Sequence, residues 1–270
     1  RVSGGRLGEQ TLLFLGAGEA ATGIADLAVT AMVAEGLDPA AARARCWLFD
    51  SRGLVHDGRG DLVEHKRPYA HPHAPVASFP DAVRALRPTA VIGVAASAGA
   101  FTEEVVREMS ALNERPIVFA LSNPTSKAEC TAEQAYRWSG GRALFASGSP
   151  FGPVNLEGRR FVPRQGNNSY IFPGVGLGAI AARASRVTDE MFMAAVHALV
   201  AQVTAEDLAQ GSLYPPLSRV REVSAHIAAA VARVVFDRGL AGVPRPPDLL
   251  AHVRAQMYEP DYVDYTPARP

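Results

Sequence analysis

Residues 12–21 read Leu-Leu-Phe-Leu-Gly-Ala-Gly-Glu-Ala-Ala, so four large apolar residues run directly into Gly-x-Gly-x-x-Ala. This spacing is typical of a strand, a turn and a helix that together bind a dinucleotide. Gly16 allows the tight turn, Gly18 lets the backbone approach a pyrophosphate, and small Ala21 lets the helix lie against the sheet. The phosphates are expected at the N-terminus of this helix, where unpaired N–H groups favour negative charge.

Asp50 ends the second predicted strand, where an acidic side chain commonly accepts hydrogen bonds from an adenosine ribose. It lies about 30 residues beyond the glycines, further than the usual spacing of roughly 20. We expect residues 37–44 to absorb the difference as a short additional helix. The alternative is that Asp50 belongs to an ordinary turn.

A hydroxyl and several cations follow Asp50 closely, namely Ser51, Arg52, Arg59, Lys66 and Arg67. Asp50 alone repels a ribose 2′-phosphate and therefore favours NAD. The neighbouring cations and the hydroxyl can instead bind that phosphate through charge-assisted hydrogen bonds. For any one of these cations a solvated basic loop is the alternative, but as a group they favour NADP.

Amide side chains follow the sheet at two later positions. Asn123, in Leu-Ser-Asn-Pro-Thr, comes directly after a predicted strand, and ligands of open α/β sheets bind outside the carboxyl ends of strands. Asn167 and Asn168 follow Gly166 in a loop-like segment. An amide can donate to a carboxylate and accept from a hydroxyl, so these residues suit a hydroxy-acid substrate. An Asn-Pro turn and an Asn-rich loop without function are the alternatives.

Strands and helices alternate over residues 1–150, which predicts an α/β fold: a Rossmann-like, doubly wound, mostly parallel sheet with additional C-terminal helices. Strands are expected at 11–15, 45–49, 90–94, 116–121 and 143–146. Helices are expected between them at 22–35, 39–44, 80–86, 102–112 and 131–138. Residues 151–270 are expected to complete this domain with helices at 174–184, 189–203 and 223–238 that pack on the sheet, followed by a Pro/Arg-rich surface extension from Val243.

Composition excludes several classes of protein. The 270 residues carry 27 basic and 27 acidic side chains, so no bulk attraction to nucleic acid or to a membrane is expected. Cys46 and Cys130 lie far apart, which argues against a zinc site or a disulfide framework and favours an intracellular, reducing compartment. His71 and His73 are expected to be solvated loop residues. The sequence contains no Ser/His/Asp triad pattern, no metal-ligand spacing, no apolar run of transmembrane length and no signal peptide before Gly16.

Several segments together resemble the malic enzymes, which oxidatively decarboxylate malate. The matching segments are FLGAGEAA (14–21), FALSNPT (119–125), LFASGSPF (144–151), QGNNSYIFPG (165–174), LYPPL (213–217) and QMY (256–258). They span essentially the whole chain in the family's order. The resemblance implies that the chain is the NAD(P)-binding domain of such an enzyme, of the type that prefers NADP over NAD.

The resemblance also implies site residues. Those expected to bind the cofactor are Gly16, Ala17, Gly18, Glu19, Ala20, Asp50, Ser51, Lys66, Val94, Ala95, Asn123 and Asn168. Those expected to bind substrate are Asn123, Asn167 and Asn168. The chain departs from the family's Pro-Gly-Gln-Gly at Arg164, which bears on the path of the loop before Asn167.

No catalytic residue and no metal ligand is assigned within this chain. The family's general-acid tyrosine, general-base lysine and three carboxylates that bind Mg²⁺ or Mn²⁺ lie upstream of the matched segment, so the catalytic N-terminal domain is expected to be absent here. For the complete enzyme the resemblance implies malate and pyruvate as substrate and product, and a homo-oligomer. The alternatives are a non-catalytic nucleotide-binding module and another Rossmann-type dehydrogenase.

Overall fold

The computed structural model describes residues 2–259 of the 270, and the chain forms two compact units. The first, here called the sheet unit, comprises residues 2–168 and 200–217. The second, here called the helical unit, comprises residues 169–199 and 218–259. The chain therefore leaves the sheet unit, returns to it and leaves it again.

A six-stranded sheet forms the centre of the sheet unit. Its strands are β1 (Leu12–Leu15), β2 (Cys46–Asp50), β3 (Gly53–Leu54), β4 (Ala90–Gly93), β5 (Ile117–Ala120) and β6 (Leu144–Ser147). They lie in the order β3-β2-β1-β4-β5-β6, and every neighbouring pair is parallel except β2 with β3. From β1 the chain proceeds to β2 on one side and later to β4 on the other, so the winding direction reverses between β1 and β4. The predicted fold class is confirmed.

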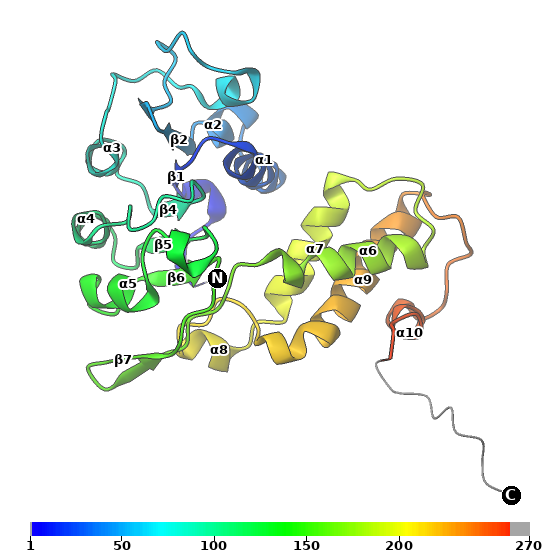
Figure 1. Ribbon diagram of the computed structural model, residues 1–270. Coiled ribbons are helices and arrows are strands. Elements are labelled where there is room, and N and C mark those ends of the chain that lie inside the picture. Colours follow the sequence, from blue (N-terminus) through cyan, green and yellow to red (C-terminus); the bar gives the residue numbers. More distant parts are fainter. Residues whose placement is uncertain (1, 260–270) are drawn as a thin grey trace, which may run out of the picture. The chain divides into compact units, whose positions relative to one another are not determined.

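Helices cover both faces of this sheet (Figure 1). One face carries α1 (Glu19–Ala34) and α2 (Pro39–Arg43), and the other carries α3 (Phe79–Leu86), α4 (Glu103–Leu112) and α5 (Ala132–Trp138). Because successive side chains of a strand point to opposite faces, Leu12 and Phe14 pack with α1 while Leu13 and Leu15 pack on the opposite face. Burial on both sides explains why these strands are apolar throughout.

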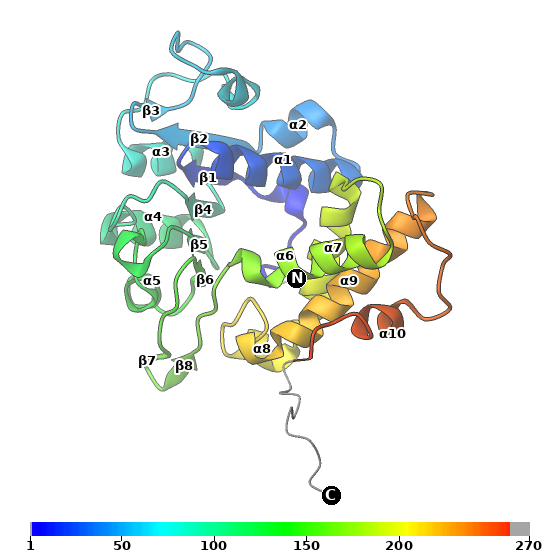
Figure 2. The same cartoon turned by 45° about the vertical axis from the view of Figure 1, so that its right-hand side comes forward.

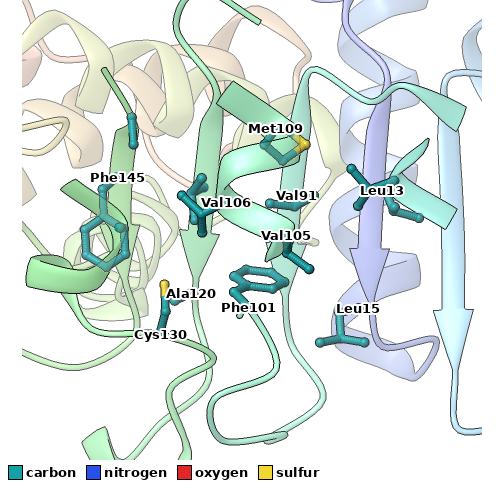
Figure 3. Packing of buried hydrophobic residues seen from close by; sticks show 14 of the residues in the cluster. Leu13, Leu15, Val91, Phe101, Val105, Val106, Met109, Ala120, Cys130 and Phe145 are labelled. Carbon is teal, nitrogen blue, oxygen red and sulfur yellow. The ribbon is translucent and has the colours of Figure 1, made fainter. Parts of the chain in front are cut away.

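The core under α4 shows how the sheet and helices interlock (Figure 3). Phe101, Val106 and Met109 lie against strand residues such as Val91 and are fully buried. Packing of this kind fixes α4 on β4 and β5, and so fixes the loops that leave the carboxyl ends of both strands.

Residues 151–168 and 200–217 belong to the sheet unit, although the sequence predicts that its core ends at residue 150. The hairpin of β7 (Val154–Leu156) and β8 (Arg159–Phe161) stacks Phe161 on Tyr136 with ring centroids 4.3 Å apart. After the hairpin, the Val162 N–H donates to the Gln210 carbonyl at 2.9 Å. This bond holds the end of α8 (Ala205–Ala209) against the sheet unit. The sheet unit therefore extends beyond the core predicted at residues 1–150.

The helical unit contains most of α7 (Asp189–Ala201), together with α6 (Phe172–Ala181), α9 (Val220–Asp237) and α10 (Leu249–Arg254) (Figure 2). A Cβ added to Gly174 would lie 2.6 Å from Cβ of Ile227, so the glycines of α6 let it approach α9 closely. These helices were expected to pack on the sheet; in the structure they form a compact unit of their own. Helix α10, which buries Leu249 and Val253, lies where an extended tail is expected.

The remaining described elements are short 3₁₀ helices, at Leu7–Glu9, Glu64–Tyr69, Thr125–Lys127, Asn168–Tyr170 and Leu217–Arg219. Between residues 2 and 259 we find no helix with the length and apolar character needed to cross a membrane.

Candidate dinucleotide-binding site

The turn after β1 needs glycine at its first position. Gly16 adopts φ +129°, and its N–H donates to the Phe49 carbonyl at 2.8 Å. A Cβ at Gly16 would lie 3.0 Å from Cγ2 of Val94 and 3.2 Å from the Val94 carbonyl oxygen. The turn is therefore held against the carboxyl end of β4 in a conformation that L-residues rarely adopt.

Gly18 leaves open space where the turn becomes a helix. It is the N-cap of α1, no side chain caps this end, and a Cβ added to Gly18 would meet no atom within 4 Å. Gly18, Glu19 and Ala20 are exposed, whereas Ala21 is fully buried among the residues that join α1 to the sheet. Unpaired backbone N–H groups at the start of a 16-residue helix therefore face solvent, an arrangement that suits a pyrophosphate.

Asp50 lies at the carboxyl end of β2 with its carboxylate fully engaged. Its oxygens accept from Nη1 and Nη2 of Arg59 at 2.9 and 3.2 Å, and from Nζ of Lys66 at 2.7 Å. The backbone N–H of Arg52 donates to the same carboxylate at 2.9 Å. Burial by itself raises the pKa of Asp50, but the hydrogen bonds from Arg59 and Lys66 outweigh it and leave the pKa below its ordinary value.

The surroundings of Asp50 carry a net positive charge. This group, here called the Asp50 cluster, contains Asp50, Asp61, Arg52, Arg59 and Lys66. Three cations against two carboxylates leave one positive charge. The side chain of Arg59 is only 8% exposed and pairs with both carboxylates, reaching Asp61 at 2.7 Å. Ser51 is exposed in the turn beside the cluster.

A hydrogen bond ties the loops after β4 and β5 together. Val94 donates its N–H to the Leu15 carbonyl at 2.9 Å, and Ala95 is exposed. The next N–H, that of Ala96, donates to Oγ of buried Ser122 at 2.9 Å. Asn123 follows Ser122 and is exposed. Asn123 therefore leaves the sheet beside the segment that contains Val94 and Ala95.

The segment before the two asparagines extends the same edge of the sheet. The Gly166 N–H donates to the Ser147 carbonyl, at the end of β6, at 2.8 Å. A Cβ on Gly166 would lie 3.1 Å from Cδ2 of Leu121, so this segment lies against the chain that leads to Asn123. Asn167 and Asn168 follow immediately, and Asn168, the last residue of this stretch of the sheet unit, begins a 3₁₀ turn.

Arg164 departs from the family pattern, yet the backbone around it is paired. Its carbonyl accepts from the Ser147 N–H at 3.5 Å, and the Gln165 side chain donates to the Gly148 carbonyl at 3.2 Å. The Nε of Arg164 is buried and has no hydrogen-bond partner in the part of the chain that the structure describes. Backbone pairing with β6 therefore sets the path of this loop.

Two side chains at the site were not predicted from the sequence. Glu129 is fully buried, and its carboxylate accepts from the N–H and the hydroxyl of Ser122. His65 lies beside the glycine turn, with Nε2 3.3 Å from the Ala17 carbonyl oxygen and Nδ1 3.7 Å from Oε1 of Glu19. Neither belongs to a binding motif, and the only signal for Glu129 is an acidic residue close to the Ser-Asn-Pro-Thr segment.

His71 and His73 pack on Trp47, with ring centroids 4.8 and 5.7 Å from its ring. The Nε2 of His71 also lies 2.9 Å from the Cys46 carbonyl oxygen. Both were expected to be solvated, but each is half-buried against the aromatic ring. Over residues 2–259 no three His, Cys, Asp or Glu side chains are grouped so that they could hold a metal ion.

Known proteins with NADP-dependent malic enzyme in their names match nearly the whole chain. A chloroplastic NADP-dependent malic enzyme of Zea mays is 50% identical over 268 residues, which cover 98% of this chain and 42% of that protein. An NADP-dependent malic enzyme of Phaseolus vulgaris is also 50% identical, over 98% of this chain and 46% of its own length. The chain thus spans less than half the length of these relatives.

The fold matches solved malic enzymes as well. The crystal structure of Entamoeba histolytica malic enzyme superposes with a TM-score of 0.72 at 25% identity, covering 94% of this chain and 48% of that one. A family model described as "Malic enzyme, NAD binding domain" matches residues 1–236. With the glycine turn, the reversal of winding beside it and this match in place, the chain belongs to the malic enzyme NAD-binding domain family.

Proposed function

We propose that this chain is the NADP-binding part of an enzyme that oxidatively decarboxylates malate to pyruvate and carbon dioxide. The observation that carries the proposal is the open glycine turn at the head of α1, beside a positively charged cluster at the end of the next strand. The relatives from Zea mays and Phaseolus vulgaris are named NADP-dependent malic enzymes, which supports the proposal.

The sheet order gives the cofactor one direction across the site. The pyrophosphate lies over Gly16–Ala20 at the centre, because that is where the unpaired N–H groups are. The adenosine ribose then lies over β2, at Asp50, and the nicotinamide lies over β4 and β5 on the other side of β1. The residues placed at the nicotinamide end are Val94, Ala95, Asn123 and Asn168.

The Asp50 cluster supports NADP as the preferred cofactor. A bare carboxylate beside a ribose repels a 2′-phosphate, but Arg59 and Lys66 already neutralise the charge of Asp50. Lys66 keeps donors beyond the one that it uses on Asp50, because an ammonium group has three. Together with the exposed hydroxyl of Ser51, it is well placed to bind the phosphate through charge-assisted hydrogen bonds.

Asparagine side chains at the substrate end can hold malate but cannot carry its protons. Asn123, Asn167 and Asn168 donate to carboxylates and accept from the hydroxyl, which positions C2 against the nicotinamide. Bound NADP supplies the hydride acceptor. The proton carriers and the ligands of Mg²⁺ or Mn²⁺ then belong to a further part of the enzyme, which we propose acts as a homo-oligomer.

Two buried free cysteines, Cys46 and Cys130, suit a reducing compartment, and we place the enzyme inside the cell.

Calorimetric titration of the 270-residue chain with NADPH and NADH tests the proposal. We expect both to bind, with NADPH tighter by about tenfold, the equivalent of ~1.4 kcal/mol from the contacts to the 2′-phosphate. Binding of neither cofactor would reject the site, and equal or tighter binding of NADH would reject the assignment of the Asp50 cluster.

A further inference from the structure

Glu129 is an unusual residue to find inside this fold. Its side chain is fully buried between the loops that leave β4 and β5. In the region from residue 2 to residue 259, no lysine, arginine or histidine forms an ion pair with it. A buried carboxylate without a cation is costly unless hydrogen bonds satisfy it. The bonds that satisfy Glu129 come from one residue, Ser122, through its N–H at 3.3 Å and its hydroxyl.

Ser122 connects Glu129 to the loop that follows the neighbouring strand, β4. Because its hydroxyl proton is donated to Glu129, its oxygen is free to accept the Ala96 N–H at 2.9 Å. Ala96 adopts φ +53°, a left-handed conformation that alanine rarely takes and that needs support from its surroundings. The chain of bonds from Glu129 through Ser122 to Ala96 therefore ties the loop after β5 to the loop after β4.

The space for the Glu129 carboxylate is made by Gly93, the last residue of β4. A Cβ at Gly93 would lie 2.3 Å from Cδ of Glu129 and 2.7 Å from its Oε1. The backbone of Glu129 is also fixed, since its carbonyl accepts the Phe101 N–H at 3.0 Å. The Glu129 carboxylate therefore occupies the space beside Gly93 of β4, and the loop that carries Glu129 is held in place by its backbone.

We propose that Glu129 is a positioning residue that holds the nicotinamide end of the cofactor site through Ser122. The inference rests on the proposed function, which places the nicotinamide against Ala95 and Asn123. Ala95 directly precedes Ala96, and Asn123 directly follows Ser122. Both residues are thus one peptide bond from the chain of bonds that Glu129 organises.

The effect of losing Glu129 is specific to one end of the cofactor. Ser122 and Ala96 lie in the loops after β5 and β4, whereas Asp50 ends β2 on the far side of β1 and Lys66 donates to its carboxylate. Loss of the Glu129 carboxylate frees the Ser122 hydroxyl to rotate and releases the Ala96 N–H. The pocket for the phosphorylated adenosine is left as it was.

Calorimetry on the 270-residue chain with two ligands tests this. The ligands are NADPH and adenosine 2′,5′-bisphosphate, which lacks the nicotinamide half. Glu129→Gln keeps the shape of the side chain but turns an amide N–H toward a group that itself donates. We expect the Kd for NADPH to rise about tenfold, and the Kd for the bisphosphate to stay within about twofold of the wild-type value.

Matched variants separate this role from a general loss of structure. Glu133→Gln makes the same change on the exposed side of α5, where Glu133 pairs with Arg137 at 2.9 Å, and should alter neither Kd. Ser122→Ala and Gly93→Ala disturb the same chain of bonds from its other members and should weaken NADPH selectively. Because Glu129 acts through Ser122, the double variant Glu129→Gln/Ser122→Ala should bind NADPH no more weakly than Ser122→Ala alone.

Equal weakening of both ligands would make Glu129 a stability residue and overturn the inference, as would unchanged NADPH binding or additive losses in the double variant. If Glu129→Gln does not fold, Ser122→Ala is measured in its place, and the change in its Kd for NADPH is compared with the change in its Kd for the bisphosphate. A wild-type chain that binds neither ligand would instead reject the proposed function, so the two failures are distinguishable.

Discussion

Arg59 holds the carboxylate of Asp50 with both terminal nitrogens of its guanidinium group, at 2.9 and 3.2 Å. The two side chains are 8% and 12% exposed, so water competes little for this pair. A bidentate pair fixes direction as well as charge. The carboxylate at the adenosine end is consequently oriented before any cofactor arrives.

Lys66→Gln should weaken NADP more than NAD. The variant loses a cation that interacts with a 2′-phosphate but not with a bare ribose hydroxyl, and it leaves Asp50 less neutralised. We expect the Kd for NADPH to rise about tenfold, or ~1.4 kcal/mol, and that for NADH to stay nearly unchanged. Arg67→Gln, at the exposed neighbouring cation, is the control in the same titrations. Equal weakening of both cofactors would make Lys66 a structural residue.

Arg59→Gln should lower stability at neutral pH and flatten its dependence on pH in acid. The folded-state pKa of Asp50 lies below its ordinary value, so this carboxylate stabilises the fold above about pH 4, and the contribution is lost as pH falls through the folded pKa. Arg59 likewise lowers the pKa of Asp61. We expect a Tm several degrees lower near neutrality, with a difference that shrinks below about pH 4.

Thermal melts of wild type, Arg59→Gln and Arg67→Gln across this range would measure the effect. A constant difference in Tm at every pH would contradict the role of these two carboxylates.

Gly18→Val should abolish cofactor binding and leave the fold intact. The new side chain meets no atom of the free protein within 4 Å of its Cβ, but it occupies the space that the pyrophosphate needs. Gly23→Val, at an equally open position on α1, should bind normally.

Gly16→Val should destabilise the fold by about 2 kcal/mol or more, because Gly16 has a positive φ and a side chain there would contact Val94. NADPH titration and melts check all three, and wild-type affinity in Gly18→Val would remove the turn from the site.

The isolated 270-residue chain should bind NADPH and yet form none from malate, even with Mn²⁺. Amides can orient malate, but they neither take up nor release a proton near neutral pH. A spectrophotometric assay beside a complete NADP-dependent malic enzyme decides this. Metal-dependent turnover by the chain alone would reveal catalytic groups that our assignment misses, with Asp50, Glu103, Lys127 and Tyr170 the first to test.

Continuous apolar runs made the parallel strands predictable to within about one residue at most ends. Strand β1, predicted at 11–15, runs from Leu12 to Leu15. Helix α1 begins three residues before the predicted 22, because Gly18 caps it without the side-chain oxygen that marks most helix starts. The hairpin β7–β8 has three residues in each strand, too few for alternation to identify it. Helix α6 is apolar around its whole circumference, so periodicity does not say which face packs or on what.

The candidate site was predictable where a motif fixes residue types. Gly16 directly follows β1, Gly18 and Asn123 lie three residues beyond the ends of β1 and β5, and parallel strands end at a common edge. The contacts of Arg59 with Asp50 and of Glu129 with Ser122 depend on how irregular loops fold back over nine and seven residues, and sequence spacing does not predict these loop conformations. The side chain of Glu129 also needs the space that Gly93, on β4, leaves by lacking a side chain.

The hydrogen bonds from Val162 to Gln210 and Ser212 determine how much of the chain must be synthesised before the sheet unit can finish folding. The Val162 N–H pairs with the Gln210 carbonyl, and its own carbonyl accepts the Ser212 hydroxyl at 2.6 Å. All of α6 and all of α7 lie between these partners in the sequence. A nascent chain that stops after residue 168 therefore carries every strand of the sheet but leaves Val162 unpaired. The ribosome must first synthesise α6 and α7 before the sheet unit can close, and a gene cut after residue 168 would yield an unfinished domain.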